Sequence, residues 1–173
     1  MIAFGLGVLR SARGERALRV VGGLLVGKEV LGFVGTLFAP MTLRGVEGTL
    51  TDTMHGILTM VGVLFYLLAM GFGATAFGKR FRLYSIGTIL VLFVFGTLTG
   101  MDTPRMAANL STPWMGVYEC VNIYATMLWI ALLATALLRV QVERPQDALG
   151  GARRVTPRAN SRRSPSSIAT VPK

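Results

Sequence analysis

Four long stretches of this chain contain almost no charged side chains, and each is long enough to cross a lipid bilayer. A transmembrane helix needs about 20 mostly apolar residues, and only helices or closed barrels satisfy their backbone groups inside lipid. Charged residues make up 15% of the chain, against about 25% in a typical soluble domain. The sequence therefore predicts an all-α, polytopic transmembrane helical bundle with four full spans. These are residues 17–38, 52–78, 83–100 and 113–138.

The segments on either side of these spans differ from them in composition. Residues 1–9 form an apolar stub that is too short to span the bilayer. The stub is either the end of a helix that starts upstream of Met1 or a half-buried anchor. Residues 140–173 are rich in Arg, Ser and Pro with few large apolar side chains, which is typical of a disordered segment. We therefore divide the chain into a stub with a basic loop (1–16), a four-span bundle (17–139) and a disordered basic tail.

Basic residues alternate from one connection to the next. The loop at 10–19, the turn at 79–82 and the tail are rich in Arg and Lys, whereas the loops at 39–51 and 101–112 carry one Arg each, with acids beside them. Membrane proteins keep their Lys- and Arg-rich loops in the cytoplasm. The alternation thus predicts a multi-pass protein of the cytoplasmic membrane with a cytoplasmic C-terminus. The bases of the tail are candidates to attract anionic lipid.

The net charge and the rare residue types exclude several classes of protein. Lys and Arg exceed Asp and Glu by ten (18 − 8), but the excess lies at span ends and in the tail, so we expect a lipid bilayer and no nucleic acid as partner. The single Cys120 excludes an intramolecular disulfide and a multi-thiolate metal site. The single His55 excludes multi-histidine metal centres. We predict no cofactor and assign no metal site, and a homo-oligomer stays open.

Lys28 and Glu29 are the most deeply placed charges, near the middle of the first span. A charge at a helix centre costs about 2.5–3.5 kcal/mol to insert, so it normally faces the bundle and has a partner. Adjacent side chains point about 100° apart on a helix, so we expect each charge to find its partner on another span. They form either structural ion pairs or a proton or ion relay.

Asp52 and His55 open the second span from its outer end. They are three residues apart and therefore share one helix face, which continues through Thr59, Gly62 and Tyr66. Asp52 also stands where a carboxylate can cap the free N–H groups of a helix N-terminus. The interpretations left open are a helix cap and a satisfied interfacial histidine, or a functional acid and base.

A second polar face opens the fourth span. Glu119, Asn122, Thr126 and Trp129 have the spacing of one helix face. Because the predicted topology places Glu119 at the depth of His55, we predict a polar pocket that opens outward. Its candidate residues are Asp52, His55, Glu119 and Asn122, with Ser85, Thr88 and Thr99 contributed by the third span.

An internal similarity relates the two halves of the bundle. A shift of 61 residues aligns residues 30–54 with residues 91–115 and makes nine of the 25 positions identical, among them Gly35 with Gly96 and Thr36 with Thr97. The shift moves two spans along the chain, so it preserves topology. The sequence thus suggests a parallel repeat of helical hairpins. Because the chain is rich in apolar residues, its Val and Leu matches carry less weight than its Thr and Arg matches.

Three short motifs resemble a known family of prokaryotic membrane proteins. They are Phe38-Ala39-Pro40 at a helix end, His55-Gly56 opening the next span, and Pro113-x-x-Gly116-x-x-Glu119 opening the last. With these motifs the chain resembles the domain of unknown function 998 (DUF998) family. The resemblance implies a bacterial or archaeal cytoplasmic membrane, and it brings no established activity. Family members usually show about six spans, more than the four expected here. This chain has Met41 where members usually carry an acid and Cys120 where they tend to carry Arg.

Three functions are compatible with these features. The first is an integral membrane protein with a structural, regulatory or accessory role and an outward-facing polar pocket. The second is a small ion- or proton-coupled transporter that uses Lys28 and Glu29. The third is a membrane-embedded hydrolase of the outer leaflet that uses Asp52, His55 and Glu119, since such a set can perform acid–base chemistry or bind one divalent cation. The sequence favours the first and leans against an enzyme, because no nucleophile motif is present.

Overall fold

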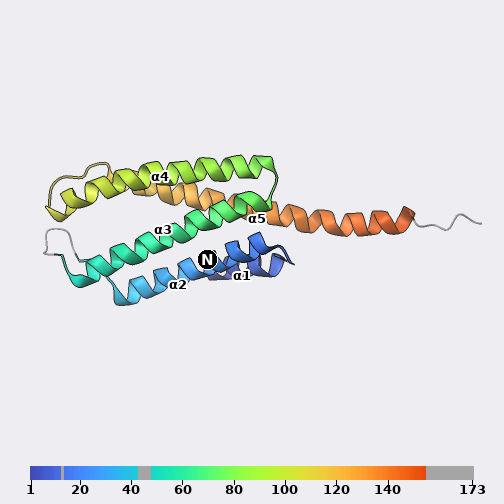
Figure 1. Ribbon diagram of the computed structural model, residues 1–173, viewed down its shortest axis with the longest axis horizontal. Coiled ribbons are helices and arrows are strands. Elements are labelled where there is room, and N and C mark those ends of the chain that lie inside the picture. Colours follow the sequence, from blue (N-terminus) through green and yellow to red (C-terminus); the bar gives the residue numbers. More distant parts are fainter. Residues whose placement is uncertain (13, 43–47, 155–173) are drawn as a thin grey trace, which may run out of the picture. The chain divides into compact units, whose positions relative to one another are not determined.

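The described part of the chain is built from helices alone (Figure 1). The computed structural model describes residues 1–12, 14–42 and 48–154, with side chains as far as Gln141. Four of its helices are long and apolar enough to cross a membrane, which confirms the predicted all-α bundle with four spans. The helices are α1 (Ile2–Ser11), α2 (Arg16–Phe38), α3 (Leu50–Ala76), α4 (Lys79–Ala107) and α5 (Met115–Arg154).

Prolines mark two of the helix ends, whereas Pro104 and Pro145 lie inside helices. α2 ends at Phe38, just before Pro40, as predicted. Pro113 is expected in the first turn of the last span, whereas α5 begins at Met115, so the proline lies in the turn before it. Pro104, expected in a loop, lies within the last turns of α4. The proline has no N–H to donate to the Gly100 carbonyl, so α4 lacks one backbone bond there and continues for three more residues.

α5 continues along the chain past residue 139, the last residue of the predicted bundle. Close contacts divide the chain into one unit ending at Leu138 and a second beginning at Arg139, next to the predicted boundary. The helix nevertheless continues to Arg154 through the first residues of the predicted tail. Gln, Glu, Arg, Ala and Leu in this segment are good helix formers. Residues 155–173, the rest of the tail, lie outside the described residues.

The apolar stub forms a short helix that packs against the first half of α2. α1 has ten residues, so at 1.5 Å per residue it is about 15 Å long, half the thickness of a bilayer core. Two glycines allow the close approach: a Cβ on Gly5 would lie 2.7 Å from Val26, and one on Gly22 would lie 2.7 Å from Leu9. Gly14, at a φ of +100°, provides the sharp reversal between the two helices.

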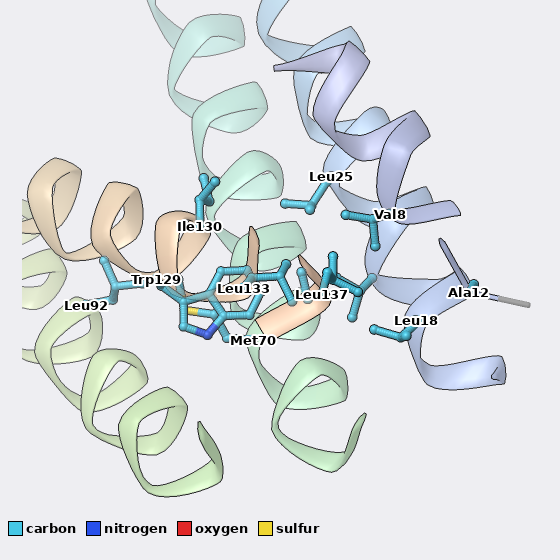
Figure 2. Packing of buried hydrophobic residues seen from close by; sticks show 12 residues of the cluster. Val8, Ala12, Leu18, Leu25, Met70, Leu92, Trp129, Ile130, Leu133 and Leu137 are labelled. Atoms are coloured by element: carbon cyan, nitrogen blue, oxygen red, sulfur yellow. The ribbon is translucent and has the colours of Figure 1, made fainter. Parts of the chain in front are cut away.

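The hydrophobic core of the bundle lies at the end that contains the α1–α2 and α3–α4 turns. Trp129 and Leu133 of α5 pack with Met70 of α3, and all three are completely buried (Figure 2). Val8 of α1 and Leu18 of α2 belong to the same cluster. Because this one cluster includes residues of all five helices, it holds the bundle together at this end.

The two halves of the internal similarity pack differently. Thr36 and Thr97 occupy equivalent positions, and each hydroxyl donates to the carbonyl oxygen four residues earlier. Gly35, however, is buried against Leu58 of α3, whereas its equivalent Gly96 on α4 is exposed with open space beside it. The matching residues therefore do not make matching helix contacts.

Candidate functional site

Asp52 forms hydrogen bonds that join the α2–α3 connection to the start of α3. Its carboxylate accepts hydrogen bonds from the backbone N–H and hydroxyl of Thr42, both at 2.7 Å. It also accepts from the N–H of Thr49 at 2.8 Å and from the Thr49 hydroxyl at 2.9 Å. Thr49 in turn caps the Asp52 N–H, so the two residues form a capping box. The structure thus shows the helix-capping role that was one of the two interpretations of Asp52.

His55 joins the end of α2 to the first turns of α3. Its Nδ1 lies 2.8 Å from the carbonyl oxygen of Ala39, the residue that follows α2. Because a carbonyl oxygen only accepts, the proton of the neutral ring must be on Nδ1, and Nε2 carries the lone pair. The ring is half-buried and Ala39 is fully buried. His55 is therefore engaged in helix packing through one nitrogen and retains an acceptor at the other.

Glu119 belongs to a different helix from these two residues. It is exposed on the second turn of α5, and within the described part of the chain no hydrogen bond or ion pair joins it to His55. Asn122, one turn further along α5, is half-buried, and its buried Oδ1 has no hydrogen-bond partner among the described residues. The predicted site of Asp52, His55, Glu119 and Asn122 thus stays a prediction, with its members on two separate helix ends.

The polar face of α5 packs against α4. Exposure falls steadily along it, from an exposed Glu119 to a completely buried Trp129. The Trp129 indole N–H donates to the hydroxyl of Ser85 on α4 at 2.9 Å. Thr88 and Thr126 are buried in the same region, and each hydroxyl donates within its own helix. Spacing on the sequence placed Thr126 and Trp129 on one helix face, but it did not reveal the bond between Trp129 and Ser85.

The two charges of the first span pair with each other. Lys28 Nζ lies 3.1 Å from Glu29 Oε1 and 4.9 Å from the centroid of the Tyr66 ring on α3. The expectation that both charges find partners on other spans is wrong for Glu29. Although adjacent side chains leave the helix about 100° apart, the flexible Lys and Glu stems bend toward each other. Gly62 of α3 faces this pair, and a Cβ there would lie 3.9 Å from Lys28 Cγ, an ordinary van der Waals contact.

Lys28, Glu29 and Tyr66 form the most deeply placed charged group that the structure describes, and we call these three residues the mid-span cluster. Lys28 and Glu29 retain 28% and 22% of their side-chain exposure. Glu29 also lines a depression between the start of α1 and the middle of α2. Helical spacing places Tyr66 on the same face of the second span as His55. Its position opposite Lys28 depends on how α2 and α3 pack, which the sequence does not show.

Metal-binding geometry is not found in the described ranges. No three His, Cys, Asp or Glu residues there come together in a group that could hold a metal ion. Cys120 is exposed on α5. The described polar contacts include hydrogen bonds at helix ends, the bond between Trp129 and Ser85, and the Lys28–Glu29 pair.

Comparison with known proteins gives one match. A family model described as a protein of unknown function (DUF998) matches residues 1–136, which include α1 and nearly the whole of the four spans. No curated protein matches, and no solved structure matches. The family resemblance found in the sequence motifs is thereby confirmed.

Proposed function

The chain belongs to the DUF998 family of proteins of unknown function, and we propose that it serves as a structural or accessory protein of the bilayer. It is an integral membrane protein with four candidate spans. The observation that supports this role is the bond between His55 and the Ala39 carbonyl, which uses the single histidine to fasten two helices. Asp52, the other residue that opens this span, is bound to the same connection.

Thermal unfolding of His55 variants tests this role. His55→Ala leaves the buried Ala39 carbonyl unpaired, which costs about 1–3 kcal/mol, and we expect lower stability and lower abundance in the membrane. His55→Asn can still present an N–H near the Nδ1 position and should recover part of the loss. Glu119→Ala, an exposed change on another helix, is the matched control. Equal stability of His55→Ala and the control would contradict a structural role for the histidine.

The second candidate function is ion- or proton-coupled transport. It is supported by the mid-span cluster, where Lys28 pairs with Glu29 beneath the ring of Tyr66. A carboxylate that exchanges its cationic partner for a proton is the usual element of such a relay. Proteoliposomes should then show proton- or ion-dependent flux that Glu29→Gln abolishes and Glu119→Gln leaves intact. Equal flux in liposomes with and without the wild-type protein would exclude this function.

We also propose the orientation and the membrane. The α1–α2 and α3–α4 turns carry the bases and face the cytoplasm of a prokaryotic cell. Single cysteines introduced in a Cys120→Ser background test this: Gly48→Cys and Gly78→Cys lie at opposite ends of α3, at exposed glycines with open space beside them. A membrane-impermeant maleimide applied to intact cells should label the cysteine at position 48 and leave the one at position 78 unlabelled. The reverse pattern would invert the proposed topology.

A further inference from the structure

One end of the bundle carries a concentration of exposed bases. They come from the end of α1, the first turns of α2 and the first turn of α4, and all of them are exposed. The only acid among these described segments is Glu15. We call the set the basic collar, and its members are Arg10, Arg16, Arg19, Lys79, Arg80 and Arg82.

Interactions within the bundle do not explain the basic collar. In the described ranges the one salt bridge joins Lys28 and Glu29, which are far from it. Arg82 donates through Nε to the Ala74 carbonyl at 3.4 Å, a long bond to a neutral acceptor. The charges of the collar are thus not neutralised by acids of the described bundle.

Helix stability does not explain these bases either. The N-terminus of a helix is its positive end, so a base in the first turn is unfavourable. α2 and α4 nevertheless begin with bases and have no acid in their first turns. α3, which begins at the opposite end of the bundle, has Asp52 in its first turn. The positive-inside rule accounts for the side of the membrane on which the bases lie, and their charges remain available to an anion outside the bundle.

We propose that the basic collar binds the anionic headgroups of phospholipids. The surface next to the collar is apolar and exposed, with Val20 at 38% and Leu83 at 61%, each one residue from a base. A phospholipid has the matching chemistry, because its phosphate meets the bases while its acyl chains lie along these side chains. The site lies on the described bundle and is independent of the C-terminal tail.

Native mass spectrometry of the purified full chain tests the proposal. The protein is released from micelles that contain phosphatidylglycerol and phosphatidylcholine in equal amounts, and the bound copies of each lipid are counted. A base near a membrane surface contributes about 1 kcal/mol, or about fivefold. The double variant Lys79→Gln/Arg80→Gln should therefore lower the preference for phosphatidylglycerol by up to about 30-fold. Arg16→Gln/Arg19→Gln, on another helix, should lower it similarly.

Two control variants test whether the lipid preference depends on charge and on this end of the bundle. Lys79→Arg/Arg80→Lys keeps the charge and should keep the preference, and Arg105→Gln removes an exposed base at the opposite end and should leave it unchanged. Every variant retains the tail, so a preference that survives both double neutralisations would overturn the proposal. It would also be overturned if the wild-type protein showed no preference, or if millimolar inorganic phosphate released the lipid and so identified a site for free phosphate.

Discussion

The hydrogen bond between Trp129 and Ser85 is the contact whose removal tests the packing of α4 against α5 most directly. The indole is completely buried and its N–H donates to the Ser85 hydroxyl at 2.9 Å. The indole also contacts α3, since a Cβ on Gly73 would lie 2.9 Å from its Cζ2. Ser85→Ala leaves the N–H without a partner in an apolar environment, where water cannot replace the lost acceptor.

The expected energies follow from the burial of the two side chains. Ser85→Ala should lower the free energy of unfolding by about 1–2 kcal/mol, the cost of an unpaired buried donor. Trp129→Phe removes the donor and part of the ring and should cost about 2 kcal/mol or more, because it also opens a cavity. In the Trp129→Phe background the serine has lost its donor. We therefore expect Ser85→Ala to cost less there, by a coupling of about 0.6–1.7 kcal/mol, the range measured for hydrogen bonds between membrane helices.

Unfolding of all four variants in mixed micelles with increasing dodecyl sulfate, followed by circular dichroism, measures this coupling. Thr97→Ala is the matched control, because it removes a hydroxyl from the same helix, but this hydroxyl bonds within α4 and lies on an exposed face. The control should change stability by less than about 0.5 kcal/mol. If Ser85→Ala costs the same with either Trp or Phe at position 129, the bond contributes nothing and the argument from burial is refuted.

Three further predictions follow from other contacts. Gly73→Ala should destabilise the bundle by about 1–3 kcal/mol because its Cβ would meet the indole of α5, whereas Gly71→Ala, with nothing within 4 Å, should unfold like the wild type. Asp52→Ala should cost about 0.5–2 kcal/mol through loss of the α3 cap, and an unchanged unfolding midpoint would contradict that role. Lys28→Met alone should lower the free energy of unfolding more than Lys28→Met combined with Glu29→Gln, since the single change leaves a carboxylate without its cation. Equal losses of unfolding free energy would show that the two charges are not coupled.

The spans and the local structure at their ends were readable from the sequence. Long apolar stretches force the backbone to bond within itself in lipid, so hydropathy fixes the helices almost regardless of how they pack. The cap formed by Asp52 and the helix end before Pro40 are likewise decided by residues close together in the chain. The inward face that carries Trp129 follows from helical periodicity alone. Pro104 was misplaced because one missing hydrogen bond near a helix end is too weak a signal to end it.

The partners of the polar side chains depended on the packing of helices. Spacing places His55 on an inward face but does not specify the Ala39 carbonyl as its acceptor, 16 residues earlier. Lys28 and Glu29 were identified as charges that need partners, yet their mutual pairing beside the Tyr66 ring depends on how α2 packs against α3. Periodicity defines which face of a helix is buried, whereas hydrogen bonds and ion pairs depend on distances of a few ångströms between helices. Those distances are set by the shapes of all the side chains in the interface together.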